Sequence, residues 1–233
     1  MTAKTIIITG AAGGLGAALS RECLKAGFNT VMLDKDRRGL EKAWDEMTAN
    51  EVAEPALYPL DLLGAGPEHF EELLEKVSGE FGGLDALVHC AARFDGLTPL
   101  EQFPPPEWLA TIQVNLNAAW LLSAQSLPLL RKSAAGSLYF MLEDLPRMGR
   151  AFWGAYGVSK HALAALVSQF AAECHSSGVQ VLGINPGVMR TAIRARSYHA
   201  ENPQLQPTPE AAARKILGFL SRDSVPEGIL VDL

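Results

Sequence analysis

The sequence predicts an α/β fold: a doubly wound parallel sheet of seven strands with helices on both faces. Three observations predict it. Short apolar runs rich in β-branched residues alternate with longer segments of helical period along the chain, and Gly, Pro, Asn or Asp flanks each apolar run. A third observation is a glycine-rich turn directly after the first apolar run.

Seven candidate strands follow in chain order, at residues 5–9, 30–34, 56–61, 84–90, 137–142, 179–185 and 228–232. Helical spacing predicts helices between them at 15–26, 37–49, 68–81, 106–131, 155–176 and 209–220. The last helix has Thr208 at its cap position and Pro209 at its first helical position, a typical helix start.

Composition predicts one mildly acidic soluble domain over residues 1–233. Hydrophobic residues make up 48% of the chain, charged residues 20%, and the net charge is −6. A domain of this length buries roughly three-quarters of its unfolded surface, so it needs no disulfide or structural metal. No block of like charges suits nucleic acid, and no apolar run reaches the roughly 18 residues of a membrane helix. We therefore expect neither nucleic acid nor membrane as a partner.

The cysteine pattern favours a reducing cytoplasm. Cys23, Cys90 and Cys174 are odd in number and widely separated, with no C-x-x-C pair, which predicts neither a disulfide framework nor a metal site. The apolar run near the start is too short for the core of a signal peptide.

The first strand leads into a turn that suits a phosphate group. Its residues are Thr9, Gly10, Ala11, Ala12, Gly13, Gly14, Leu15 and Gly16. Glycines let the backbone approach a pyrophosphate closely, and the N–H groups and dipole at the helix start stabilise its charge. Glycines alone would also fit an ordinary strand-to-helix turn, but their place between the first strand and an amphipathic helix favours dinucleotide binding.

Two aspartates end neighbouring strands. Asp34, at the end of the second strand, is placed to accept hydrogen bonds from the adenosine ribose. Its carboxylate would repel the 2′-phosphate of NADP, which favours NAD, although Lys35 and two arginines nearby keep NADP possible. Asp61, at the end of the third strand, suits the adenine amino group. Polar strand ends without a ligand are the alternative for both residues.

A tyrosine and a lysine one helical turn apart begin the helix at 155–176. Their spacing places Tyr156 and Lys160 on one helix face. A nearby cation favours tyrosinate and would lower the pKa of the phenol, so the pair could serve as an acid–base unit. An amphipathic contact with a solvated lysine is the alternative when the pair is considered alone.

These segments together resemble the short-chain dehydrogenase/reductase (SDR) family. The matching residues, in order, are Thr9-Gly10-x-x-x-Gly14-x-Gly16, Asn115, Tyr156-x-x-x-Lys160, and Asn185-Pro186-Gly187 followed by Thr191. The similarity spans essentially the whole chain. The stretches at 149–156 and 186–195 look most like the bacterial branch of YciK-like oxidoreductases.

The resemblance implies a Rossmann fold and hydride transfer between NAD or NADP and a carbonyl/alcohol carbon of a small molecule. Tyr156 would be the general acid in reduction and the general base in oxidation. Lys160 would lower the pKa of this tyrosine and hold the nicotinamide ribose, and Asn115 would hold a water in a proton relay. Further cofactor contacts implied by the resemblance come from Leu62, Cys90, Ala91, Ala92, Pro186, Gly187, Val188 and Thr191. The family pattern also implies a homodimer or homotetramer formed through the helices at 106–131 and 155–176.

One departure from the family falls at the reaction centre. The family has a serine about thirteen residues before the tyrosine, where this chain has Glu143. An ionised carboxylate would raise the pKa of Tyr156, repel a developing alkoxide and donate no hydrogen bond to a substrate carbonyl. A protonated Glu143 could replace the serine, and a carboxylate could also bind an amine or hydroxyl. Alternatively, Glu143 turns outward.

A second departure follows the fourth strand, where the family has Asn-Ala-Gly and this chain has Cys90-Ala91-Ala92. Cys90 is a weak hydrogen-bonding partner and is expected to pack as a small apolar side chain, as His89 is expected to pack beside the sheet.

Three functions remain open: an NAD(P)-dependent oxidoreductase with an atypical site, a catalytically impaired dinucleotide-binding sensor or partner protein, and a purely structural protein. The proline-rich segment 93–106 and the polar segment 188–209 follow strands and are expected to be loops that wall the substrate pocket. The second contains several basic residues, which could attract an anionic substrate or lie in solvent.

Overall fold

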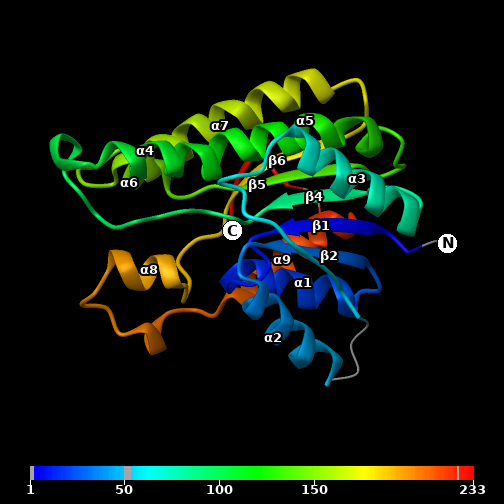
Figure 1. Ribbon diagram of the computed structural model, residues 1–233, viewed down its shortest axis with the longest axis horizontal. Helices are drawn as coiled ribbons and strands as arrows, with labels where there is room; N and C mark the ends of the chain where they lie inside the picture. The colour runs from blue at the N-terminus through cyan, green and yellow to red at the C-terminus, as the bar shows by residue number, and fades with distance from the viewer. Residues whose placement is uncertain (1–2, 50–53, 225) are drawn as a thin grey trace.

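The computed structural model describes residues 3–49, 54–224 and 226–233 (Figure 1). Its strands are β1 (Thr5–Thr9), β2 (Asn29–Asp34), β3 (Ala56–Pro59), β4 (Ala86–His89), β5 (Ser137–Met141), β6 (Gln180–Asn185) and β7 (Leu230–Asp232). They form one sheet in the order β3-β2-β1-β4-β5-β6-β7, and every neighbouring pair is parallel. The predicted seven-stranded, doubly wound sheet is confirmed.

Helices cover both faces of the sheet (Figure 1). One face carries α1 (Gly14–Lys25), α2 (Arg37–Thr48) and α9 (Pro209–Ser221), and the other carries α3 (Pro67–Phe81), α4 (Pro105–Ile112), α5 (Ala118–Leu130) and α7 (Gly154–Cys174).

Strand β1 shows why the sheet has two cores. Successive side chains of a strand point to opposite faces. Ile7 therefore packs in a cluster with apolar residues of α3, α5 and α7, whereas Ile6 and Ile8 pack in a second cluster with residues of α1, α2 and α9. All three isoleucines are completely buried, as expected of a central parallel strand.

The helix expected at 106–131 is interrupted. Helices α4 and α5 are joined by a π-helical segment at Gln113–Asn117, which contains Asn115. A π segment within a longer helix is a frequent feature of functional sites. The bounds of the other helices and of the strands differ from the expected ones by a few residues. Strand β3, for example, ends at Pro59, and Asp61 lies in the turn that follows, where its side chain accepts a hydrogen bond from the Leu63 N–H.

Two short helices form where the sequence predicts none. Helix α6 (Leu145–Met148) begins where the carboxylate of Asp144 accepts a hydrogen bond from the Arg147 N–H. Helix α8 (Ala192–Ser197) begins in the same way with the hydroxyl of Thr191. These side chains cap the first turns, a local signal that the polar composition of both segments conceals. Short 3₁₀ turns also form at Leu100–Gln102 and Pro203–Leu205.

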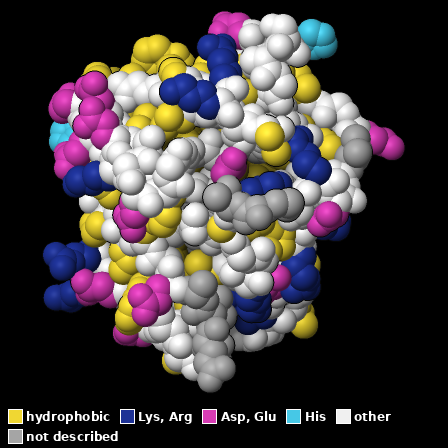
Figure 2. Space-filling view, turned by 90° about the vertical axis from the view of Figure 1, so that its right-hand side faces the viewer, with side chains coloured by type: hydrophobic (Ala, Val, Ile, Leu, Met, Phe, Trp, Pro, Cys, Tyr) yellow, Lys and Arg dark blue, Asp and Glu magenta, His cyan; other side chains and the backbone are white. Residues whose placement is uncertain are grey.

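The strands run toward the side on which α6 and α8 lie, so their carboxyl ends meet there (Figure 1). Figure 2 shows the opposite side, where acidic and basic side chains are intermingled over the visible surface. Within the described part of the chain, no helix has the length and apolar character needed to cross a membrane.

Candidate active site

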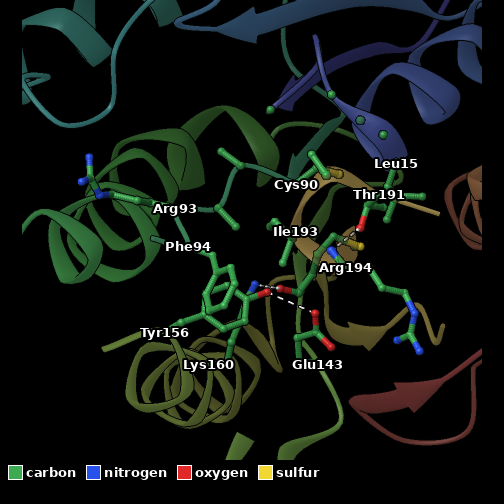
Figure 3. Close-up of a pocket in the computed structure, with 18 of the residues that line it drawn as sticks. Leu15, Cys90, Arg93, Phe94, Glu143, Tyr156, Lys160, Thr191, Ile193 and Arg194 are labelled. Atoms are coloured by element: carbon green, nitrogen blue, oxygen red, sulfur yellow. Dashed lines mark hydrogen bonds between the residues drawn. The ribbon is translucent and has the colours of Figure 1, made fainter. Parts of the chain in front are cut away.

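A cavity of about 640 Å³ lies at the carboxyl ends of the strands (Figure 3). Segments that follow β1, β2, β4, β5 and β6 all contribute to its lining, together with α7 and α8. This is the crevice in which an open parallel sheet binds its ligands.

The glycine turn after β1 forms one wall and leaves no room for larger residues. Gly10 has a φ of +69°, and a Cβ there would lie 2.6 Å from the Ala91 nitrogen. A Cβ on Gly16 would overlap the carbonyl oxygen of Gly10. These contacts explain why both positions need glycine.

The start of α1 offers unpaired donors to the cavity. Gly13 caps this helix without a side-chain hydrogen bond, and its first turn has no acidic residue. Gly13, Gly14 and Leu15 line the cavity, as does Gly16. Backbone N–H groups and the positive end of the helix dipole at this position fit a pyrophosphate.

Thr9 and Ala12 do not line the cavity, and their contact with the cofactor stays a prediction. Thr9 is buried, and its hydroxyl accepts a hydrogen bond from the Ala91 N–H at 3.2 Å. The Ala12 N–H donates to Oδ2 of Asp34 at 3.1 Å. Both residues fix the glycine turn against the ends of β2 and β4.

The two aspartates lie where the sequence places them. Asp34 lines the cavity beside Lys35, and its carboxylate also accepts a hydrogen bond from the Asp36 N–H at 3.0 Å. Asp61 lines the same end of the cavity together with the buried Leu62. The sequence-based assignment of an adenosine end is therefore compatible with the geometry.

The segment after β4 packs closely against the glycine turn. Cys90, Ala91 and Ala92 line the cavity. Burial raises the pKa of the Cys90 thiol to about 12, so the side chain is a neutral, small apolar group rather than a nucleophile.

His89, at the end of β4, packs within the sheet layer as expected. It is hydrogen-bonded to the Ser123 hydroxyl at 2.8 Å and stacked on Phe140. Burial lowers its pKa to about 3, so the imidazole stays neutral.

Glu143 faces the cavity and contacts the predicted acid–base tyrosine. The Tyr156 hydroxyl donates a hydrogen bond to Oε1 of Glu143 at 3.1 Å (Figure 3). Glu143 follows β5 and Tyr156 lies in the first turns of α7, so two separate elements bring them together. The alternative that Glu143 turns outward is wrong.

The pKa of Tyr156 shifts in the direction expected beside an ionised Glu143, opposite to the lowering expected from Lys160. Burial, the negative charge of Glu143 and the hydrogen bond to it raise the pKa of Tyr156 well above its ordinary value. Lys160 lies 5.4 Å from the centre of the Tyr156 ring and donates to the Met141 carbonyl at 2.7 Å. Burial lowers the pKa of Lys160 itself. Burial and Glu143 together therefore outweigh the lowering of the Tyr156 pKa that is expected from Lys160.

Asn115 is buried behind this pair and does not line the cavity. Its amide oxygen accepts from the Arg93 N–H at 2.7 Å, and its nitrogen donates to the Arg93 carbonyl and the Ser159 hydroxyl, each at 3.0 Å. The side chain therefore joins the segment after β4 to α7. Its role in holding a water stays a prediction.

The segment after β6 closes the cavity opposite α7. Pro186, Gly187, Val188 and Thr191 all line it. The Gly187 N–H donates to the Asn185 side chain at 3.2 Å, and Gly187 adopts a φ of +74°. This turn directs the chain from the sheet into α8, beside the expected nicotinamide position.

Sequence reasoning missed an aromatic wall of the cavity, formed by Phe94, Trp153 and Tyr198. Phe94 packs edge-on against Tyr156 with ring centres 5.2 Å apart, and Trp153 lies 6.0 Å from the same ring. The signal was weak: Trp153 precedes Tyr156 by three residues, which is one turn on the same helix face.

Only part of each predicted loop reaches the cavity. Residues 93–95 line it, whereas Pro99, Leu100 and Glu101 line a separate groove beside Val158. In the second segment, residues 188–189, 191–194 and 196–198 line the cavity.

The basic side chains at the cavity are held by neighbours. Arg194 forms a bidentate pair with Glu201, at 2.6 and 2.8 Å, and Arg147 pairs with Asp144 at 3.1 Å. Arg196 donates to the Phe94 carbonyl at 3.2 Å. These contacts favour a structural role over the expected attraction of an anionic substrate.

Comparisons with known proteins agree with this geometry. The family profile described as short chain dehydrogenase matches residues 4–202. The oxidoreductase YciK of Escherichia coli is 32% identical over 221 residues, which cover 95% of this chain and 87% of that protein.

Solved structures are similar over the whole fold. A short chain dehydrogenase from Shigella flexneri complexed with NADP has a TM-score of 0.93 at 30% identity, covering 100% of this chain and 97% of that one. An Escherichia coli short chain dehydrogenase complexed with NADPH has a TM-score of 0.92 at 31% identity, with the same coverage. A Pseudomonas syringae structure has a TM-score of 0.92 at 36% identity, covering 99% and 94% of the two chains. The fold, the profile match and these identities establish that the chain belongs to the short chain dehydrogenase family.

Proposed function

We propose that the chain is an NAD(P)-dependent oxidoreductase that transfers a hydride between a nicotinamide dinucleotide and a carbonyl/alcohol carbon of a small molecule, with an atypical acid–base group. The observation that carries the proposal is one cavity joining the uncapped start of α1 to Tyr156 and Lys160. A dinucleotide bound along this cavity would supply or accept the hydride.

Each part of the cavity has a distinct task in this proposal. The glycine turn holds the pyrophosphate, Asp34 the adenosine ribose, and Lys160 the nicotinamide ribose. Tyr156 stays protonated near neutral pH because its pKa is raised, so it is suited to donate a proton in reduction. Because its O–H donates to Glu143, the tyrosine must turn from the carboxylate before it can protonate a substrate oxygen.

The choice between NAD and NADP depends on the charged residues at the cavity edge beside the end of β2. The carboxylate of Asp34 favours NAD through repulsion of a 2′-phosphate, while the exposed Lys35 beside it attracts that phosphate. The similar structures complexed with NADP and NADPH do not support an NAD preference. We propose that both dinucleotides enter and that these two charges set their ratio.

The second candidate function is a dinucleotide-binding sensor or partner protein with impaired catalysis. The hydrogen bond between Tyr156 and Glu143 favours it, because the phenol proton is directed away from any substrate. Binding of dinucleotide without turnover, together with carbonyl reduction gained in Glu143→Ser, would identify this alternative.

Titration of the purified chain with NADH and NADPH tests the main proposal. We expect saturable binding, seen as a change in dinucleotide fluorescence, and hydride transfer with a panel of small carbonyl compounds. Tyr156→Phe should lower the rate about 100-fold or more while leaving the dissociation constant of the dinucleotide unchanged.

Tyr58→Phe is the matched control, because Tyr58 lies on β3 and does not line the cavity. This variant should keep the wild-type rate. Absence of binding for both dinucleotides would contradict the proposal and also the sensor alternative.

We also propose that the protein acts in the cytoplasm as a homodimer or homotetramer. The described cysteines Cys23, Cys90 and Cys174 are all free thiols, which suits a reducing compartment.

A further inference from the structure

Glu143 is a carboxylate at the reaction centre, and among the described residues it forms no ion pair within 4 Å, although its charge acts on Lys160 and Arg147. The ion pairs at the cavity are Arg93 with Asp95, Arg147 with Asp144, and Arg194 with Glu201. Glu143 instead accepts a hydrogen bond from the neutral Tyr156 hydroxyl. A carboxylate has further acceptor positions, and Glu143 lines the cavity, so it can accept another donor from a ligand.

The surroundings of Glu143 also suit a cation. The aromatic wall (Phe94, Trp153 and Tyr198) lines the same cavity, and aromatic faces attract cations. The protein uses one of these rings in this way, because the Arg194 guanidinium lies 4.5 Å from the centre of the Tyr198 ring. The buried Lys160 ammonium donates to the Met141 carbonyl, and the negative charge of Glu143 stabilises the charged forms of Lys160 and Arg147 without a direct ion pair.

A carbonyl oxygen is poorly matched to this arrangement. Negative charge develops on that oxygen during reduction and needs hydrogen-bond donors. Glu143 as a carboxylate only accepts, and the O–H of Tyr156 already donates to it. A protonated nitrogen has the opposite requirements: it donates a hydrogen bond and is stabilised by a negative charge.

From this juxtaposition of an aromatic wall and a carboxylate with no ion pair within 4 Å we infer that the preferred substrates are small amines and the corresponding imines, bound as cations with the nitrogen donating to Glu143. This inference rests on the proposed function, because it keeps the dinucleotide and the hydride and replaces C=O by C=N. The carboxylate keeps the imine nitrogen protonated, which makes its carbon a better hydride acceptor.

The step balances without a proton from the protein. The hydride from the reduced dinucleotide forms a new C–H bond, and the C=N π pair becomes the lone pair of the amine nitrogen. The imine is reduced and the dinucleotide is oxidised. Tyr156 then serves as a positioning residue that holds Glu143 toward the nitrogen.

Binding of two probes of nearly the same shape tests the inference without any dinucleotide. Benzylamine is a cation at neutral pH and benzyl alcohol is neutral. By calorimetric titration of the wild-type chain, we expect benzylamine to bind at least about tenfold more tightly. Glu143→Gln, which keeps the size and removes the charge, should abolish this preference, and Glu143→Ser should do the same.

The matched control is Glu101→Gln, which removes an equal charge from an exposed residue of the separate groove. This variant should keep the preference for benzylamine. Thermal unfolding of each variant, followed by circular dichroism, identifies any loss of fold. Equal binding of the two probes to the wild-type chain, or an undiminished preference in folded Glu143→Gln, would overturn the inference.

Turnover gives a second readout. With reduced dinucleotide, the wild-type chain should reduce a phenyl-substituted cyclic imine faster than acetophenone, and Glu143→Ser should reverse this order. Dinucleotide binding without a preference for the imine would overturn this inference and leave the proposed function intact. Failure to bind any dinucleotide would instead contradict the proposed function, while the amine preference would still be decided by the two probes.

Discussion

Glu143 controls the proton chemistry of Tyr156. A tyrosine can act as a general base only after it has lost its proton, and burial, the charge of Glu143 and the hydrogen bond to it all favour the protonated form. Glu143, at the position where the family pattern has a serine, is therefore expected to affect reduction and oxidation differently. In the proposed carbonyl reaction, reduction would keep its proton donor near neutral pH, and oxidation would have little of its base.

The pH dependence of alcohol oxidation follows from this shift. The rate should rise with pH in proportion to the tyrosinate fraction, and a raised pKa places that rise above pH 10 in the wild-type chain. Glu143→Ser removes the negative charge and should move the rise to lower pH by about one unit or more. Measuring kcat for a small alcohol across the alkaline range checks this. Identical profiles for the two proteins would show that Glu143 does not govern Tyr156, and Glu101→Gln should leave the profile unchanged.

Asp34 is predicted to control the choice of dinucleotide. Asp34→Asn keeps an oxygen that can accept from the Ala12 N–H and removes the charge that faces a 2′-phosphate. The ratio of the NADP to the NAD dissociation constant should fall at least about fivefold, which corresponds to about 1 kcal/mol. Lys35→Ala should shift the ratio in the opposite direction. Fluorescence titration with both dinucleotides measures it, and a ratio that stays constant in both variants would show that the 2′-phosphate binds elsewhere.

At the scale of elements, the strands and long helices were predictable from the sequence, whereas the π segment and the short helices α6 and α8 were not. The alternation of apolar runs and helical segments predicts the strands and the long helices because burial on both faces requires it. The π segment at Gln113–Asn117 was not predictable, because its residues also suit an ordinary α-helix and tertiary contacts decide the outcome. The same holds for α6 and α8, whose capping residues Asp144 and Thr191 are isolated polar residues in the sequence.

The candidate site likewise has parts that were predictable from the sequence and parts that were not. The glycine turn and the pair Tyr156 and Lys160 were predictable because their spacing within one element carries the signal. The aromatic wall was not, because Phe94, Trp153 and Tyr198 come from three separate segments that meet only in the folded chain. The direction of the Tyr156 pKa shift likewise depends on where the side chain of Glu143 points.

The π segment is predicted to contribute stability through Asn115. Asn115→Leu keeps a similar volume and removes the hydrogen bonds to Arg93 and Ser159, which leaves the backbone groups of Arg93 without these partners. The free energy of unfolding should fall by about 1–3 kcal/mol. Asn117→Leu is the matched control, because Asn117 is exposed and bonds only to Gln113 among the described contacts. Its effect should stay within about 0.5 kcal/mol. Urea unfolding measures both, and equal effects would show that the Asn115 bonds carry no special weight.

At the scale of the whole molecule, the helices that cover one face of the sheet expose large apolar side chains to solvent. Leu109 of α4, Trp120 of α5 and Val158 of α7 are exposed by 68%, 50% and 47%. These helices pack over the same side of the sheet (Figure 1). Soluble monomers rarely expose apolar residues in such density, so this helical layer is the expected subunit interface.

Assembly through this layer gives a prediction of mass. Light scattering behind size-exclusion chromatography should give two or four times the 25.0 kDa of one chain. Trp120→Asp places a charge where the interface would bury it, which should shift the protein to the single-chain mass or to a strongly concentration-dependent mixture. Leu205→Asp is the matched control, because Leu205 is 80% exposed but lies in the 3₁₀ turn beyond α8, outside helices α4, α5 and α7. The change at Leu205 introduces the same charge, so a lower mass in both variants would point to general destabilisation. A wild-type particle of 25.0 kDa would show that the exposed apolar residues of α4, α5 and α7 do not form a subunit interface.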